Sequence, residues 1–293
     1  MKISLGSWAF SFGPFASNPV AFDKTAHRLA AAGFDGIEIC GFPPHVTLNS
    51  HPTSESRRAL VEFLRDLKLE VSGYAADFTM ANPVAEGNGY KYLELFKKNL
   101  DMAIALESPT IRVDTIAAPG SLLDSEYDSA MDRLSGVWHQ AAALAADAGI
   151  RMVWEFEPGF LFNKPSEVLR LHQKVAHANF HVLFDTSHAY MCGVVGARQH
   201  GAPERLHGGV KEFLNLLSWR IGAIHVIDSD GTLHGDETST HCPFGEGNID
   251  FKALAPELKQ IPDIDWWCID LCFLPKSWEL VVPSLQFVRK LVE

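Results

Sequence analysis

Four segments in the second half of the chain carry an acidic or imidazole side chain within or directly after a short apolar run. The segment VLFDTSHAY, for example, passes from three apolar residues to Asp185 and then to His188. A carboxylate at the end of a buried strand is costly unless a partner neutralises it. Three carboxylates and one imidazole form a mostly oxygen donor set, which suits Mn²⁺, Mg²⁺ or Co²⁺ better than structural zinc. The sequence therefore predicts a divalent metal site with the ligands Glu155, Asp185, His225 and Asp270.

The alternation of side chains along these segments predicts that the four ligands share one face. In RMVWEFE, Glu155 and Glu157 alternate with the bulky residues Met152, Trp154 and Phe156. Because successive side chains of a strand point to opposite faces, the apolar set would pack outward against helices and the acids would face inward. The same alternation surrounds Asp185, His225 and Asp270.

Each of these residues taken alone has a simpler structural interpretation. Asp185 could be a helix N-cap, and His225 could be a hydrogen-bonded core histidine. Glu157 could form an ion pair with a nearby arginine. Asp270 is the hardest to explain in this way, because it interrupts the apolar run WWCIDLCF. The shared alternation of all four residues favours a common site.

The elements that must position these residues form a regular series of β-rich segments and longer helical patterns. Strands are predicted at 2–10, 36–40, 69–76, 110–115, 151–157, 180–187, 221–229 and 265–272. Helical patterns include 90–107, 129–149 and a closing helix from 277 in which Pro283 could form a kink. This series predicts a single (β/α)₈ TIM barrel over 1–293, since about 250 residues is typical of that fold. An open doubly wound sheet is disfavoured because no GxGxxG follows the first strand.

Two long stretches rich in glycine and histidine, 188–210 and 228–249, follow predicted strands. In a TIM barrel, the loops after the strands build the active site, and long loops in a compact domain are usually functional. Both stretches are therefore expected at the mouth of the barrel.

The net charge of −11 opposes a nucleic-acid partner and adhesion to anionic membranes. The chain has no run of about 18 apolar residues, and its start, MKISLGSWAF, is typical of a strand rather than a signal peptide. Five scattered cysteines without a CxxC pair argue against a disulfide framework or a thiolate zinc site. A cytoplasmic location is expected, and homo-oligomerisation is left open.

Over nearly its whole length, the chain resembles the xylose-isomerase-like superfamily of sugar (phosphate) isomerases and epimerases, to which AP-endonuclease-type barrels also belong. The resemblance rests on AAAGFDGIEI, GIRMVWEFEP, VLFDTSHA, IGAIHVIDSDG and GEGNIDF. It implies a TIM barrel with a divalent metal, commonly Mn²⁺, that moves a proton next to the carbonyl of a small carbohydrate. The family's metal ligands fall on Glu155, Asp185, His225 and Asp270, and its substrate-contacting histidine falls on His188.

Metal-assisted proton abstraction next to a carbonyl is the working hypothesis, and it suggests roles for the other polar residues. Glu155 is the first candidate for the base and Glu157 the second, with His188 holding a substrate oxygen or acting as an acid. The candidates for further substrate contacts are Arg112, Asp228 and His45. Arg112 could equally be a structural ion-pair partner, and His45 could equally be a solvated loop histidine. The absence of a phosphate-binding motif favours an unphosphorylated sugar.

Asp270 departs from the family's epimerases, in which the ligand on the last strand is a glutamate that works opposite the strand-five glutamate. Aspartate is one methylene shorter, so the departure favours single-base chemistry such as aldose–ketose isomerisation or β-elimination from a 3-oxo sugar. The ending WWCIDLCF and the long loops also resemble, more weakly, the lyase-like catalytic subunits of C-glycoside deglycosidases.

Two further classes of function fit the sequence less well. A DNA-repair nuclease of the superfamily would need several zinc-binding histidines and a basic surface, which the net charge of −11 opposes. A non-enzymatic sugar-binding barrel would not need a hard cation site at its strand ends.

Overall fold

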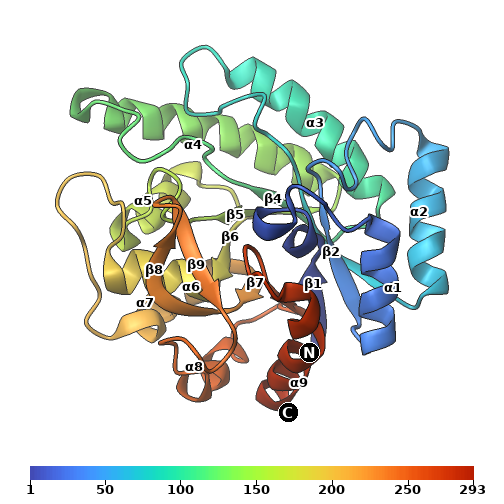
Figure 1. Ribbon diagram of the computed structural model, residues 1–293. Coiled ribbons are helices and arrows are strands. Elements are labelled where there is room, and N and C mark those ends of the chain that lie inside the picture. The colour runs from blue at the N-terminus through green and yellow to red at the C-terminus, as the bar shows by residue number, and fades with distance from the viewer.

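The computed structural model describes residues 1–293 and contains a closed barrel of eight parallel strands, with helices around its outside (Figure 1). The strands follow one another around the barrel in the order β1-β10-β7-β6-β5-β4-β3-β2, so the last strand closes against the first. The barrel strands are β1 (Lys2–Gly6), β2 (Gly36–Cys40), β3 (Glu70–Ala75), β4 (Thr110–Val113), β5 (Arg151–Glu155), β6 (Phe180–Asp185), β7 (Ile221–Val226) and β10 (Trp266–Ile269). The predicted (β/α)₈ TIM barrel is confirmed.

The helices lie between successive strands and cover the barrel. They are α1 (Phe22–Ala32), α2 (Ser54–Asp66), α3 (Gly89–Ala105), α4 (Asp124–Asp147), α5 (Pro165–Val175), α6 (Thr186–Tyr190), α7 (Gly209–Leu217), α8 (Phe251–Leu258) and α9 (Ser277–Val292). The predicted helices at 90–107 and 129–149 correspond to α3 and α4, and α4 begins one turn earlier than expected. None of these helices is both long and apolar enough to cross a membrane.

The alternation on β5 separates an outer apolar layer from the barrel interior. Met152, Trp154 and Phe156 belong to the large core between strands and helices, where the Trp154 ring lies 5.5 Å from that of Trp138 on α4. Val153 is 1% exposed but lies outside that core, and the Oε1 of Glu155, on the same face of β5, lies 2.9 Å from His225 Nδ1 in the barrel interior. The predicted inward direction of Glu155 is therefore confirmed.

The seventh barrel strand ends earlier than predicted, at Val226 rather than at 229. The side-chain hydroxyl of Thr186 accepts a hydrogen bond from Ile227 N at 2.9 Å and donates one to Ile227 O at 2.6 Å. These contacts occupy the backbone groups that would continue the ladder with a neighbouring strand. The chain then forms an antiparallel hairpin, β8 (Asp228–His234) and β9 (Thr238–Cys242), within the stretch predicted as a loop.

The stretch 188–210 is likewise more ordered than a plain loop. Asp185 caps α6, because its Oδ1 accepts hydrogen bonds from Ser187 N and His188 N, both at 2.8 Å. A π-helical turn, Met191–Val195, follows directly. The hairpin and α6 together stand over one end of the barrel (Figure 1).

Candidate active site

The carboxyl ends of neighbouring strands bring the predicted metal ligands together. Glu155 is the last residue of β5, and Asp185, the last of β6, lies in register with His225 of β7. One ligand atom from each of the three lies within 4.8 Å of the others. Glu155 is 3% exposed, and Asp185 and His225 are fully buried.

Each of these three side chains has a buried polar atom without a hydrogen-bond partner: Glu155 Oε1, Asp185 Oδ2 and His225 Nδ1. The Glu155 and His225 atoms are 2.9 Å apart but do not have the alignment of a hydrogen bond. Buried polar atoms of native proteins are nearly always paired, so three unpartnered atoms at one point need an explanation. Carboxylate oxygens and an imidazole nitrogen are common ligands of divalent cations, and the donor set therefore fits such an ion.

Asp270 lies beside this donor set but is held by other contacts. Its Oδ1 accepts hydrogen bonds from the indole N–H of Trp8 and from Cys272 N, both at 2.8 Å. It lines the same cavity as Glu155, yet it does not belong to the group of three close ligand atoms. Its role as the fourth ligand remains a prediction.

The surroundings of Glu155 and Asp185 shift the pKa values of these two carboxyls in opposite directions. Burial would raise the pKa of Glu155, but Arg112 and His225 outweigh it and hold the pKa well below its usual range. Burial raises the pKa of Asp185 well above its usual range, and the neighbouring carboxylates Asp270 and Glu155 add to this effect. A cation beside Asp185 would remove this penalty.

The hairpin β8–β9 supplies contacts that the sequence interpretation did not identify. Thr238 donates a hydrogen bond to Glu157, and the Nδ1 of His188 lies 2.8 Å from Ser239 Oγ. Burial raises the pKa of Glu157 to about 7 and lowers the pKa of His188 to about 3. At neutral pH, Glu157 can therefore both accept and donate a proton, whereas His188 is uncharged.

His241, also on β9, was missed as a site residue. It is 4% exposed, neither ring nitrogen has a hydrogen-bond partner, and its Nδ1 lies 3.8 Å from Asp270 Oδ1. The available sequence signal was its place in the loop rich in glycine and histidine after the seventh strand.

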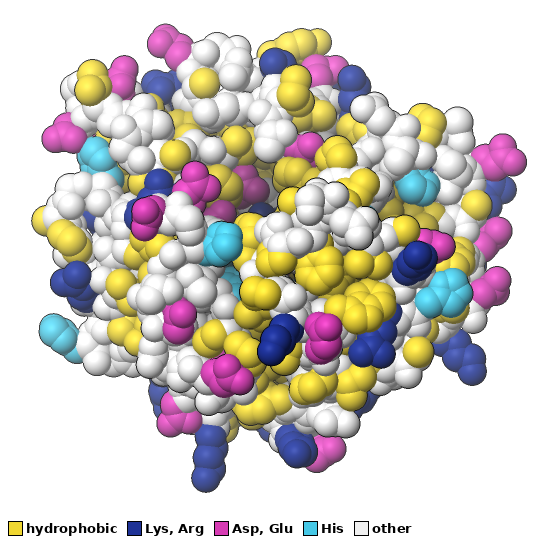
Figure 2. Space-filling model, in the orientation of Figure 1, with side chains coloured by type: hydrophobic (Ala, Val, Ile, Leu, Met, Phe, Trp, Pro, Cys, Tyr) yellow, Lys and Arg dark blue, Asp and Glu magenta, His cyan; other side chains and the backbone are white.

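A cavity of about 470 Å³ at the mouth of the barrel is lined by Glu155, Glu157, His188, His241 and Asp270. Figure 2 shows acidic, basic and histidine side chains gathered around a hollow near the middle of this face. Arg112 lines the cavity and binds two carboxylates, with its Nε 3.0 Å from Glu155 Oε2 and its Nη2 3.4 Å from Asp114 Oδ2. The remaining lining is largely aromatic and aliphatic and includes Trp8, Phe12, Phe42, Phe78, Phe160 and Phe273.

The structure does not bring two of the predicted substrate contacts to this cavity. His45 is buried elsewhere, with its Nε2 3.0 Å from the carbonyl oxygen of Val20. Asp228 is fully buried and accepts hydrogen bonds from four backbone N–H groups, those of Ser229, Gly245, Gly247 and Ile249. The carboxylate of Asp228 therefore holds the loop GEGNI against the hairpin.

Asp228→Asn is expected to lower the free energy of unfolding by about 2–4 kcal/mol, measured by urea denaturation. The asparagine amide nitrogen cannot accept a hydrogen bond, so two of the four buried N–H groups would lose their partner. Asp230→Asn in the same hairpin is the control, because only Oδ1 of exposed Asp230 is used, by Thr232. Equal stability of the two variants would contradict a structural role for Asp228.

Comparison with known proteins agrees with this architecture. The sequence pattern of the family described as "Xylose isomerase-like TIM barrel" matches residues 26–285. The chain belongs to this family.

The chain is also similar to one relative by sequence and to several solved structures. It is 25% identical over 250 residues to the uncharacterized protein MJ1311 of Methanocaldococcus jannaschii, covering 83% of this chain and 76% of that protein. The solved structure of D-psicose 3-epimerase with D-tagatose from Clostridium cellulolyticum H10 has a TM-score of 0.75 at 14% identity, with 100% of both chains covered. The solved structure of the IOLI protein with a bound zinc atom has a TM-score of 0.71 at 16% identity, covering 100% of this chain and 96% of that one. At these identities the likeness concerns the fold.

Proposed function

We propose that this protein is a metal-dependent isomerase or epimerase of an unphosphorylated sugar or keto-sugar, working by proton transfer at the carbon next to a carbonyl. One observation carries the proposal: three buried, unpartnered donor atoms lie in the same site as a glutamate whose pKa is about 7. Membership of the xylose isomerase-like family and the likeness to a D-psicose 3-epimerase support the sugar substrate.

Glu155, Asp185 and His225 would hold the metal, and the likeness to a zinc-containing barrel is consistent with this. When bound, a divalent cation would supply Lewis-acid polarisation of a carbonyl or hydroxyl oxygen. The oxygen-rich donor set favours Mn²⁺, with Mg²⁺ or Co²⁺ as alternatives.

The general base is better assigned to Glu157 than to Glu155, which reverses the order expected from the sequence. Glu155 is paired with Arg112 through Oε2 and is assigned to the metal through Oε1, and a carboxylate with a low pKa is a weak base. Glu157 lines the cavity, and its pKa of about 7 matches the requirement for general acid–base catalysis near neutral pH.

The remaining polar groups of the cavity would position the substrate. His188 is neutral and its Nε2 lies 3.8 Å from Glu157 Oε2, so it could hold a substrate oxygen beside the base. Arg112 would orient Glu155 and offer an N–H to a substrate hydroxyl. The aromatic lining would exclude water and cover the apolar face of a sugar ring.

The proposal can be tested by incubating metal-free and Mn²⁺-loaded protein in deuterated water with aldoses, ketoses and 3-oxo-glycosides. We expect metal-dependent conversion of an aldose, ketose or keto-sugar with deuterium placed next to the carbonyl. Metal-dependent release of an aglycone from a 3-oxo-glycoside would instead support the β-elimination alternative. Failure of the wild-type protein to bind any divalent metal would contradict both.

A further inference from the structure

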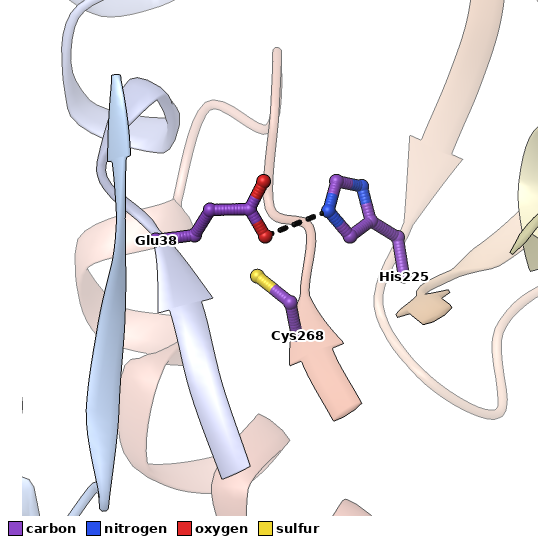
Figure 3. Close-up of side chains that lie close together, drawn as sticks. All are labelled: Glu38, His225 and Cys268. Carbon is purple, nitrogen blue, oxygen red and sulfur yellow. Dashed lines mark hydrogen bonds and ion pairs between the residues drawn. The ribbon is translucent and has the colours of Figure 1, made fainter. Parts of the chain in front are cut away.

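Glu38 lies inside the barrel at the ring nitrogen of His225 that faces away from the unpartnered donor atoms. It is the middle residue of β2, is 5% exposed, and points across the barrel toward β7. Its Oε2 lies 2.9 Å from His225 Nε2 with hydrogen-bond geometry. Figure 3 shows the carboxylate and the imidazole approaching each other, with the thiol of Cys268 close to both.

Both ring nitrogens of His225 therefore face a carboxylate. Burial would lower the pKa of His225, but Glu38 and Glu155 outweigh it and raise the pKa well above its usual range. A metal ligand must be the neutral ring, which carries only one proton. Nε2 is 2.9 Å from Glu38, and Nδ1 is 2.9 Å from Glu155. Only the Glu38 contact is aligned as a hydrogen bond, while His225 Nδ1 and Glu155 Oε1 both remain unpartnered. Since a carboxylate only accepts, the aligned contact requires the proton to be on Nε2. In the neutral form that a metal can bind, the ring keeps this proton on Nε2, and its lone pair on Nδ1 is directed toward Glu155 and Asp185.

Without Glu38, the other neighbours would not preserve this arrangement. The nearby thiol of Cys268 is a weak hydrogen-bond acceptor and cannot compete with a carboxylate for the imidazole proton. Glu155 would then be the stronger acceptor, and a proton on His225 Nδ1 would allow a hydrogen bond to Glu155 Oε1. That tautomer has no lone pair on Nδ1 for a metal.

We propose that Glu38 is a positioning residue that holds the imidazole proton of His225 on Nε2 and so keeps Nδ1 available as a metal ligand. The inference rests on the proposed metal site and adds a residue that is not itself a ligand. Carboxylates that accept the second N–H of a ligating histidine are a general feature of metal sites, and their loss typically costs 10- to 100-fold in affinity.

Two variants of similar size separate this role from a merely structural one. Glu38→Gln keeps an acceptor oxygen but loses the charge, and Glu38→Met loses the acceptor while filling the space. We expect Mn²⁺ affinity, measured by chelator competition, to fall in the order wild type, Gln, Met, with a loss of about 10- to 100-fold for Met. The control is Cys268→Ser, which alters the neighbouring interior side chain without removing the carboxylate and should bind Mn²⁺ as the wild type does.

The tautomer is read directly from ¹⁵N long-range spectra of the histidine rings in metal-free protein, with the His225 signals assigned by their loss in His225→Gln. In spectra recorded over a range of pH, the wild type should keep its proton on Nε2 where the ring is neutral, and Glu38→Met should shift the neutral ring toward the Nδ1 tautomer. An unchanged tautomer in Glu38→Met, or an equal loss of affinity in Cys268→Ser, would overturn the inference. If the wild type binds no metal, the proposed function fails, whereas the metal-free spectra still decide the role of Glu38.

Discussion

Asp185→Asn is expected to lower the affinity for Mn²⁺ by at least about 100-fold, beyond the 10- to 100-fold typical of residues that only support a ligand. The substitution is nearly isosteric and tests the two roles of Asp185 separately. Its amide oxygen can replace Oδ1, which caps α6 through Ser187 N and His188 N. The unpartnered Oδ2, the atom assigned to the metal, would become an NH₂ group that cannot bind a cation.

The same variant should be more stable than the wild type when both are free of metal. Folding raises the pKa of the Asp185 carboxyl above its value in the unfolded chain. Such a group stabilises the fold fully only at a pH below the unfolded pKa, and this stabilisation is lost as the pH rises toward the folded pKa. At neutral pH, above the pKa of an unfolded aspartate, burial of Asp185 therefore destabilises the metal-free wild type, whereas asparagine does not ionise and lacks this cost. The melting temperature should be higher for Asp185→Asn without metal and higher for the wild type with saturating Mn²⁺.

Asp185→Ala is the comparison, because it removes both the cap and the ligand and should be destabilised with or without metal. If Asp185→Asn bound Mn²⁺ as tightly as the wild type, Asp185 would be only a helix cap, the simpler interpretation noted from the sequence.

Glu157→Gln is expected to reduce turnover by about 10²- to 10⁴-fold, the usual contribution of a general acid or base. Glutamine can still accept the hydrogen bond from Thr238, so the hairpin should stay in place. Metal content should remain near that of the wild type, since Glu157 does not belong to the group of close ligand atoms. Steady-state kinetics and metal analysis of the same preparation test both parts.

The pH profile gives a second readout for Glu157. A base must be deprotonated, so kcat/KM of the wild type should fall as the pH decreases through about 7, with a bound cation moving the midpoint to lower pH. Glu167→Gln is a matched control, because Glu167 is also a largely buried glutamate with a raised pKa but does not line the cavity. Near-normal turnover in Glu157→Gln, together with loss of turnover but not of metal in Glu155→Gln, would restore Glu155 as the base.

Much of the barrel and the centre of the site could be predicted from the sequence because both depend on local regularities. Eight alternating strand and helix patterns indicate the TIM barrel, and the two-residue period of a strand assigns Glu155 to the interior once Trp154 is assigned to the helices. Parallel strands in a barrel all end on one face, so Asp185 and His225 had to meet Glu155 there. That Glu155, Asp185 and His225 converge was thus available from the chain alone.

The partners of these residues were decided only by the tertiary structure. Glu38 and His225 are 187 positions apart and become neighbours across the barrel interior, a contact that no local pattern encodes. The raised pKa of Glu157 comes from its burial, and Thr238, which donates a hydrogen bond to it, lies on β9 in a stretch that resembled a loop. Asp228 has the same sequence signal as a substrate ligand, a polar residue just after a strand, yet its oxygens are occupied by the backbone of a loop up to 21 residues away. Side-chain type and spacing determine which residues face the mouth of the barrel, whereas burial and long-range hydrogen bonds determine what each of them is free to do.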